Sequence, residues 1–329
     1  MKFGIIGTNF ISDRLLAAFP AAKAEVEAVA VYSRKKETGD AFAKKHGISL
    51  VFTDLEEFLA SDAFEAVYVA SPNMCHKEQT LAALRHGKHV LCEKPVAPSL
   101  GDYEEMKAEA CARGLVLTEA MRPVFDRAWV AIKQKMKDLG TLRTARLEYS
   151  QYSSRYDRFR AGEVLNAFNP ALSNAALLDI GVYPVAMAAY LFGEPKSVKS
   201  DIIRLSNGFE GGGNILLDYG HFSAVISYSK IADSILPSAI LGEVGGFTVD
   251  SVATPKEAFF CPRGGEKTPI LWEAKPCEDN MFEEVDAFCE MVRTGDVINT
   301  DEISRITLRI MDAVRREHGI LFPSDGGVL

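Results

Sequence analysis

The pattern of apolar and polar positions changes once along the chain, near residue 123. Before that point, short continuous apolar runs alternate with stretches whose apolar residues recur every three to four positions. The runs suit strands buried on both faces, and the recurrence suits amphipathic helices, so together they predict a doubly wound parallel sheet. The expected strands are 3–6, 26–32, 50–52, 66–70, 89–92 and 116–118, and the expected helices are 11–19, 36–45, 55–59, 76–86 and 103–112.

After residue 123 the pattern predicts a second domain of the α+β class. A helix over 127–139, a strand over 141–152 and a helix near 175–191 precede several alternating strands that end near 274. Alternating strands of this kind need an antiparallel sheet. Two helices, near 282–293 and 301–317, follow, and glycines 211–213 and 245–246 are expected in turns. We therefore expect domains at 1–122 and 123–329, with the C-terminal helix packing back on the first domain.

Charge and composition narrow the class of protein. A net charge of −8 over 329 residues argues against a nucleic-acid or anionic-membrane surface. No apolar stretch is long enough to span a membrane, and the first residues are too short and glycine-broken for a signal peptide. The six cysteines are scattered, without Cys-x-x-Cys or a histidine at metal spacing. We expect a cytoplasmic protein with reduced thiols and no metal site.

A phosphate-binding turn is predicted between the first strand and the first helix. The dinucleotide fingerprint has glycine at its first, third and sixth places, and this chain has Gly7, Asn9 and Ser12 there. Asparagine tolerates left-handed backbone, and serine is small enough for helix–strand packing. The position of the turn supports cofactor binding by residues 7–11, namely Gly7, Thr8, Asn9, Phe10 and Ile11.

The end of the second strand points to the type of cofactor. NAD-binding folds place an acidic residue there, whereas this chain has Ser33 and Arg34 followed by two lysines. An arginine can fork onto the oxygens of a 2′-phosphate, so NADP(H) is the expected cofactor and NAD(H) the alternative. The same residues would also serve as a solvated basic start to the next helix.

Two further motifs carry candidate chemistry. Lys94 lies in Glu93-Lys94-Pro95 at the carboxyl end of a buried strand, where open α/β sheets bind ligands. Asp179 and Tyr183 are spaced to share one face of a helix. A free phenol, with a pKa of about 10, is a poor base, but a neighbouring ammonium such as that of Lys94 favours the phenolate. The alternatives are a solvated loop lysine, an aspartate that caps a helix and a tyrosine packed in the core.

These motifs, in this order and spacing, resemble the Gfo/Idh/MocA oxidoreductases. The specific elements are Gly7-x-x-x-Ile11, Ser33-Arg34, 70–73 with His76, 93–95 and 178–184, and the resemblance covers essentially the whole chain. It implies a nicotinamide-binding Rossmann domain followed by a large open, mostly antiparallel sheet. It also implies hydride transfer between nicotinamide and a sugar, polyol or related hydroxy or keto compound. In that reaction Tyr183 would act as the acid/base group beside Lys94, and Asp179 would orient Lys94 or the substrate hydroxyls. Tyrosine at 183 resembles the glucose-fructose oxidoreductase and dimeric dihydrodiol dehydrogenase branch.

Further site residues are expected because they lie just after strand ends or because the resemblance implies them. The cofactor side is expected to include Ser71, Pro72, Asn73, His76, Glu93, Lys94 and Arg122. The substrate side is expected to include Glu119, Tyr152, Arg155 and Tyr156. Alternatively, His76 only caps its helix, and residues 152–160 form a solvated loop. The chain departs from the family pattern at Asn9 and at Asn174-Ala175, where glycines are common.

The expected partner is a small sugar- or polyol-like molecule, with no nucleic acid and no membrane. Alternating strands with an apolar face also make a homodimer or homotetramer through the open sheet plausible. A different class of function is a non-catalytic regulatory protein of the same fold that senses a nicotinamide or a sugar. The intact set of Lys94, Asp179 and Tyr183 argues for catalysis instead.

Overall fold

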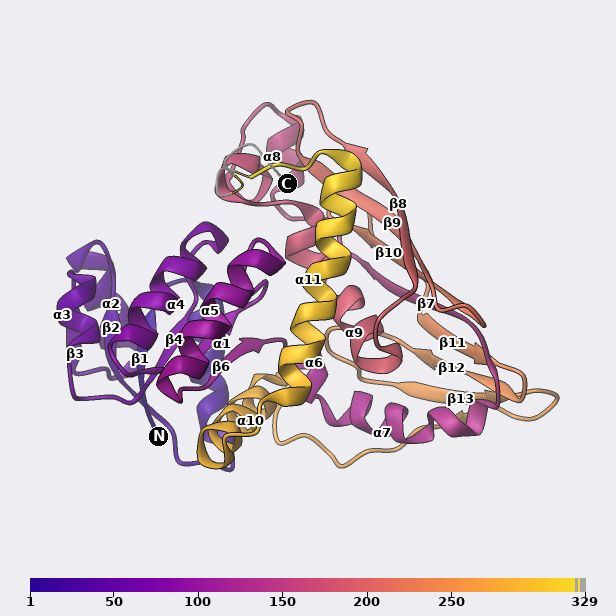
Figure 1. The fold of residues 1–329 in the computed structure, drawn as a ribbon, viewed down its shortest axis with the longest axis horizontal. Helices are drawn as coiled ribbons and strands as arrows, with labels where there is room; N and C mark the ends of the chain where they lie inside the picture. Colours follow the sequence, from indigo (N-terminus) through magenta and orange to yellow (C-terminus); the bar gives the residue numbers. More distant parts are fainter. Residues whose placement is uncertain (323–324, 326–329) are drawn as a thin grey trace. The chain divides into compact units, whose positions relative to one another are not determined.

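The computed structural model describes residues 1–322 and 325, which form two compact units. The first comprises Met1–Arg122 and Lys275–Glu302, and the second comprises Pro123–Ala274 and the described part of Ile303–Leu329. The sequence prediction had assigned residues 275–302 to the second domain. Each unit has its own sheet (Figure 1).

The first unit is a doubly wound parallel sheet, which confirms the predicted fold class. Its six strands lie in the order β3-β2-β1-β4-β5-β6, and every pair is parallel. Because the order reverses at β1, the carboxyl ends of β1 and its neighbours form the crevice where such sheets bind ligands. The strands are β1 (Lys2–Ile6), β2 (Glu27–Tyr32), β3 (Leu50–Phe52), β4 (Ala66–Val69), β5 (His89–Glu93) and β6 (Leu117–Ala120).

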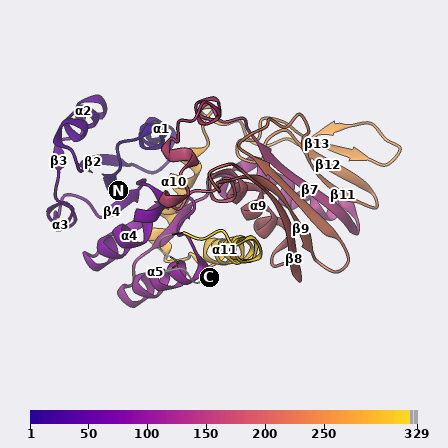
Figure 2. The same cartoon turned by 90° about the horizontal axis from the view of Figure 1, so that it is seen from above.

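Helices cover both faces of this sheet, with α4 and α5 opposite α1 and α2 (Figure 2). Their ends follow local capping rules: Ser99 accepts a hydrogen bond from the amide of Asp102, and Gly47 ends α2 in a left-handed conformation. The helices are α1 (Phe10–Ala18), α2 (Lys36–His46), α3 (Leu55–Leu59), α4 (His76–Arg85), α5 (Leu100–Arg113) and α10 (Met281–Thr294), with 3₁₀ turns at Phe19–Ala21 and Asn73–Cys75.

Helix α10 belongs to this unit because it packs on α1 and the sheet. The Phe288 ring of α10 lies 5.7 Å from the Phe3 ring of β1, and both side chains are fully buried. Aromatic pairs at this separation stabilise a core beyond the area they bury. The late segment therefore completes a core that the first 122 residues begin.

The second unit contains an eight-stranded, mostly antiparallel sheet, as predicted. The strand order is β14-β13-β12-β11-β7-β10-β9-β8, and β7 with β10 is the parallel pair. The strands are β7 (Leu142–Ser150), β8 (Ser197–Arg204), β9 (Glu210–Asp218), β10 (Ser223–Ser229), β11 (Ser238–Gly242), β12 (Gly245–Val249), β13 (Ala258–Pro262) and β14 (Thr268–Pro269).

One face of this sheet carries helices. Helix α9 (Val182–Phe192) packs on β7 and β10, and the indole of Trp129 in α7 (Arg127–Lys135) donates to the carbonyl of Val252. A π-helical turn at Leu177–Gly181 precedes α9. The remaining helical segments are α6 (Arg122–Phe125), α8 (Tyr156–Arg160) and α11 (Ile298–His318), with 3₁₀ turns at Met136–Leu139, Asn166–Phe168 and Pro170–Leu172.

The glycine clusters expected in turns lie in strands instead. Gly211–Gly213 are inside β9, and Gly245 and Gly246 begin β12. A Cβ at Gly213 would lie 2.6 Å from the carbonyl oxygen of Asp201 and 2.9 Å from the Tyr228 hydroxyl oxygen. Glycine is present here because a neighbouring strand and an aromatic ring approach the backbone closely. No helix in the described residues is long and apolar enough to cross a membrane.

Candidate active site

The turn between β1 and α1 is built around Gly7. Its φ is +107°, and a Cβ there would lie 2.5 Å from the carbonyl oxygen of Ala70. L-residues rarely adopt that backbone conformation, and the space for a side chain is absent as well. Gly7 therefore lets the turn cross directly over the end of β4.

Asn9 and Ser12 replace the other two fingerprint glycines by holding the turn with side-chain hydrogen bonds. The Asn9 side-chain oxygen accepts from the amides of Ile11 (2.9 Å) and Ser12 (3.4 Å), and its amide group donates to the Ala70 carbonyl at 2.6 Å. The Ser12 hydroxyl donates to the Gly7 carbonyl at 2.8 Å. Asn9 is thus the N-cap of α1, so the departure from glycine preserves the turn.

A pocket of about 650 Å³ opens at this turn and extends across the ends of β2 and β4. Among the residues that the structure describes, no acidic side chain lines it, whereas hydroxyl, amide and cationic groups do. That donor set, above the start of α1, fits the phosphates of a dinucleotide. The lining residues are Ile6, Gly7, Thr8, Asn9, Tyr32, Ser33, Arg34, Lys35, Thr38, Ala70, Ser71, Pro72, Cys75 and Gln79.

Half of the expected cofactor residues line this pocket. They are Gly7, Thr8, Asn9, Ser33, Arg34, Ser71 and Pro72. The others, outside its lining, are Phe10, Ile11, Asn73, His76, Glu93, Lys94 and Arg122. Sequence reasoning missed Thr38 and Gln79, although both are polar residues in the first turn of a helix, α2 and α4 respectively, that follows a strand of the sheet.

The end of β2 presents an ordered hydroxyl and an exposed guanidinium. The Ser33 hydroxyl lies 2.7 Å from that of Thr38 and donates to the Lys35 carbonyl at 3.0 Å, which fixes the start of α2. Arg34 is exposed at the rim. Burial raises the pKa of the neighbouring Cys75 thiol, and the Arg34 charge opposes that rise. The cationic rim suits a 2′-phosphate.

His76 connects two strand ends from inside the unit. The ring is 1% exposed, with Nδ1 2.9 Å from the Pro95 carbonyl and Nε2 2.9 Å from the Ser71 carbonyl. Burial lowers its pKa, although both carbonyl contacts oppose that change. Because the ring is enclosed, His76 acts on the pocket by fixing Ser71, whose hydroxyl donates to Gln79 at 2.6 Å.

The segment after β5 holds Lys94 between two buried carboxyl groups. The Glu93 carboxylate accepts from the Tyr68 hydroxyl at 2.5 Å and from the amide of Lys94 at 3.2 Å. Glu119, which was predicted on the substrate side, is buried and accepts from the amide of Val96 at 2.9 Å. The half-exposed Lys94 therefore sits on a backbone fixed from both directions.

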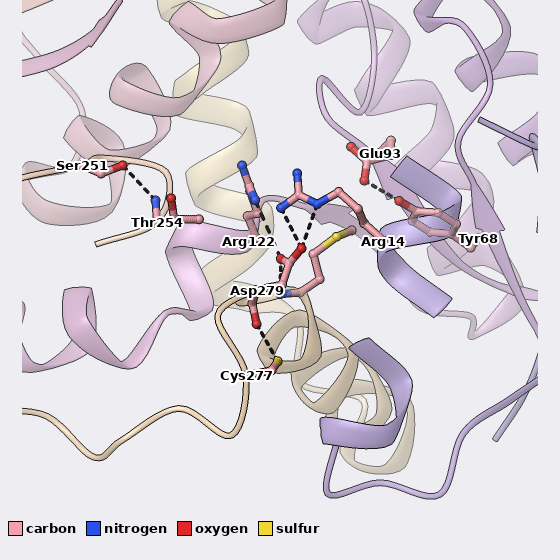
Figure 3. Close-up of polar contacts among 9 residues, drawn as sticks. Arg14, Tyr68, Glu93, Arg122, Ser251, Thr254, Cys277 and Asp279 are labelled. Atoms are coloured by element: carbon pink, nitrogen blue, oxygen red, sulfur yellow. Dashed lines mark hydrogen bonds and ion pairs between the residues drawn. The ribbon is translucent and has the colours of Figure 1, made fainter. Parts of the chain in front are cut away.

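The same unit contains a partly buried charge cluster near Glu93. Figure 3 shows Arg14 and Arg122 pointing toward the carboxylate of Asp279, at 2.7 Å and 3.9 Å respectively. Burial raises the pKa of Glu93, and burial with the Glu93 charge raises that of Glu284 well above its usual range. Neither carboxyl oxygen of Glu284 has a hydrogen-bond partner within residues 1–322 and 325.

The second unit carries Asp179 and Tyr183 on consecutive turns. Asp179 lies in the π-helical turn and is partly exposed, and Tyr183 lies at the start of α9 and is 6% exposed. The Tyr183 ring meets that of Tyr149 edge-on at 5.4 Å. A buried lysine, Lys230, places its ammonium 2.7 Å from the Asp179 carboxylate. Sequence reasoning missed Lys230 because it stands alone, far from Asp179 in the chain.

The remaining predicted positions form a half-exposed aromatic surface on the second unit. The Tyr152 hydroxyl donates to Asp157 at 2.7 Å, and the Tyr156 ring stacks on Phe168 at 5.6 Å. Arg155 is exposed between them. Asn174, at the departure from a family glycine pair, donates its side-chain amide to the Asn166 carbonyl at 2.8 Å. Within the described residues, no group of three or more histidine, cysteine or acidic side chains is arranged to hold a metal.

Two family models together match most of the chain. The model described as "Oxidoreductase family, NAD-binding Rossmann fold" matches residues 1–121, and the Gfo/Idh/MocA C-terminal domain matches residues 131–247. The first covers the pocket described above, and the second covers Asp179 and Tyr183.

Named relatives cover the chain from end to end. A Bacillus subtilis protein named scyllo-inositol 2-dehydrogenase (NADP(+)) is 44% identical over 329 residues, covering 99% of each chain. The human trans-1,2-dihydrobenzene-1,2-diol dehydrogenase is 29% identical over 344 residues, again covering 99% of each. A crystal structure of KijD10, a 3-ketoreductase from Actinomadura kijaniata with NADP and TDP-benzene, superposes with a TM-score of 0.83 at 24% identity and covers 96% of this chain and 97% of that one.

Proposed function

Because the chain belongs to the Gfo/Idh/MocA family of NAD(P)-dependent oxidoreductases, we propose that it oxidises a cyclic polyol of the inositol type, or reduces the corresponding ketone, with NADP(H). The 44% identity over 329 residues to a protein named as an NADP-dependent scyllo-inositol dehydrogenase supports the substrate class. The observation that carries the cofactor choice is a pocket without a carboxylate and with Arg34 at its rim.

The cofactor would be held mainly by the first unit. The Gly7 turn and the start of α1 would hold the pyrophosphate, and Arg34 with the Ser33 hydroxyl would hold the 2′-phosphate of the adenosine ribose, since all of them line the pocket. Ser71 and Pro72, which follow β4, would bind the nicotinamide half. NADP⁺ bound in this way supplies an acceptor for the hydride of the carbinol carbon.

The proton of the reacting hydroxyl is assigned to Tyr183. In the oxidation direction Tyr183 as phenolate takes that proton, and in the reduction direction the phenol returns it to the forming alkoxide. Lys94 acts as a cation that favours the phenolate and donates a hydrogen bond to the substrate oxygen. Asp179 orients the substrate hydroxyls or Lys94.

An oligomer through the open sheet is the second part of this proposal. The strand register places one residue from each of five strands in a row on the face opposite α9: Lys199, Leu216, Val225, Arg146 and Ala239. Leu216 is 43% exposed in this row. A homodimer or homotetramer would cover such apolar positions. A cytoplasmic location is proposed with it, in keeping with the scattered cysteines.

A spectrophotometric assay of NADP⁺ reduction tests the function. The protein should oxidise scyllo-inositol in preference to glucose, xylose and linear polyols, with a lower KM for NADP⁺ than for NAD⁺. Oxidation of an aldose alone would move the substrate class to sugars while keeping the reaction. Absence of turnover with every member of the panel, by a protein that binds NADPH tightly, would instead support the regulatory alternative.

A further inference from the structure

A buried lysine lies behind the candidate catalytic aspartate. Lys230 directly follows β10, and its side chain is only 5% exposed. The ammonium lies 2.7 Å from Oδ2 of Asp179 and donates to the Ala167 carbonyl at 2.8 Å. The backbone of Lys230 is fixed as well, because its amide donates to the Gly211 carbonyl at 2.9 Å.

The surroundings of this ammonium exclude most water. Its Nζ lies 5.0 Å from the centre of the Phe168 ring and 5.4 Å from that of Phe209. An ammonium in an apolar enclosure needs an anion and hydrogen-bond acceptors to offset its lost hydration. Asp179 supplies the anion, so the geometry of the carboxylate and that of the lysine depend on each other.

The turn that carries Asp179 is held by the sheet at both of its ends. Glu210, at the start of β9, accepts from the amide of Leu177 at 2.8 Å, and burial raises the pKa of Glu210 to about 7. At the other end, a Cβ on Gly181 would lie 3.0 Å from the Tyr228 ring of β10. π-Helical turns often mark functional sites, and contacts with β9 and β10 hold both ends of this one.

The exposure of the ion pair is unequal. The Asp179 side chain is 43% exposed, whereas its partner Lys230 is 5% exposed. A pair that served only to join the turn to the sheet would gain nothing from exposing its carboxylate, because exposure weakens the attraction between the charges. In this arrangement the Asp179 carboxylate is accessible to a ligand, whereas its counterion Lys230 is buried.

We propose that Lys230 is a positioning residue for the reaction: it holds Asp179 ionised and oriented so that the carboxylate accepts a hydrogen bond from a substrate hydroxyl. Lys230 touches neither substrate nor cofactor and acts through Asp179. This inference rests on the proposed function, because it assigns the ligand of Asp179 to the hydroxyl groups of a polyol. An ionised carboxylate only accepts hydrogen bonds, which suits a ring of hydroxyl donors.

A double-mutant cycle tests the proposal. Wild type, Lys230→Met, Asp179→Asn and the double variant are assayed with scyllo-inositol and NADP⁺, and Lys135→Met in α7 serves as an exposed-lysine control. Lys230→Met should lower kcat/KM for the polyol by about 10- to 100-fold, the range of a charged hydrogen bond, mainly through KM. KM for NADP⁺ should not change. In the Asp179→Asn background the same substitution should cost less than about threefold.

The possible results distinguish a positioning role of Lys230 from a purely structural role, and both from an error in the proposed function. Equal losses in both backgrounds, or a fall in kcat alone that tracks a lower melting temperature, would overturn the proposal. If Lys230→Met does not fold, Lys230→Gln replaces it with the same criteria, and failure of both to fold would make Lys230 structural. An active wild type without the coupling contradicts this inference alone. A wild type that oxidises no scyllo-inositol contradicts the proposed substrate, and this inference with it.

Discussion

At the scale of single residues, a side chain that departs from the expected motif can still stabilise the same local structure. Asn9 stands where the fingerprint has glycine, and the structure shows it capping α1 and bonding to Ala70. The left-handed backbone tolerance of asparagine was not the reason, because Asn9 has an extended backbone with φ of −96° and acts through its side chain. Lys230 could not be predicted, because a lone lysine after a strand carries no spacing signal toward Asp179, and only the tertiary fold brings them together.

Arg34 should discriminate between the two nicotinamide cofactors. If its guanidinium binds the 2′-phosphate, Arg34→Ala should weaken NADPH binding by about 1.5–3 kcal/mol, or roughly 10- to 100-fold, and change NADH binding little. Fluorescence titration of both reduced cofactors measures this. Lys44→Ala, at the far end of the same helix α2, is the matched control. Equal affinity of the wild type for both cofactors would contradict the assignment.

Tyr183→Phe keeps the ring against Tyr149 and removes the proton donor. General acid–base groups contribute about 10²–10⁴-fold, so kcat should fall by that order while the Kd for NADPH is unchanged. Tyr190→Phe, in the same helix α9, should keep wild-type turnover. Retention of most activity in Tyr183→Phe would move the proton transfer to another group.

Lys94→Met removes the ammonium and keeps the length of the side chain. The variant should lose activity at neutral pH and recover part of it at alkaline pH, because hydroxide can then generate the phenolate that the ammonium favoured. A profile of kcat/KM against pH tests this. The double variant with Tyr183→Phe should show no alkaline recovery. Profiles that overlap for Lys94→Met and wild type would return Lys94 to a solvated loop residue.

At the scale of elements, the sequence predicted what depends on local pattern and missed what depends on packing. Mostly apolar runs located all six strands of the parallel sheet, since burial on both faces favours apolar residues. Thr118 and Glu119 in β6 are polar exceptions that are buried. The π-helical turn and the glycines of β9 were not predicted. Position 213 of β9 is occupied by glycine because Tyr228 and β8 approach its backbone closely. Neither neighbour can be identified from the local sequence.

Helix α10 contributes a buried acid that should make the first unit less stable as pH rises. Glu284 has its pKa raised by burial and by Glu93, so the folded state binds a proton that the unfolded state releases. The contribution of Glu284 to stability is therefore fully present below its unfolded pKa of 4.5 and is lost as pH rises through the higher folded value.

Glu284→Gln should remove part of this pH dependence. Thermal melts between pH 5 and 8.5 should show the variant gaining stability over wild type as pH increases, because no buried carboxylate has to ionise. Glu290→Gln is the control on the same helix, since Arg293 lowers the pKa of that exposed side chain. Parallel curves for wild type and Glu284→Gln would mean that Glu284 does not carry the raised pKa.

At the scale of the whole molecule, the proposed roles divide between the two units. The pocket and Lys94 belong to the first, and Asp179, Tyr183 and Lys230 belong to the second. Substitutions in the second unit should therefore change turnover and polyol KM without changing cofactor affinity. The sequence could predict this division because the hydrophobic pattern changes near residue 123, whereas the return of residues 275–302 to the first unit depends on packing such as Phe288 on Phe3.

The proposed assembly through the open sheet can be tested by a substitution of Leu216. The side chain lies on the open face of β9, between Lys199 of β8 and Val225 of β10 in the register. A two-fold interface there would contain Leu216 twice, so Leu216→Glu would bury two like charges and should convert a dimer to monomers. Light scattering after size exclusion measures the mass, and NADPH titration should give the wild-type Kd. Leu271→Glu, exposed beyond β14, controls for the added charge. A monomeric wild type, or a dimer that survives Leu216→Glu, would contradict assembly through this face.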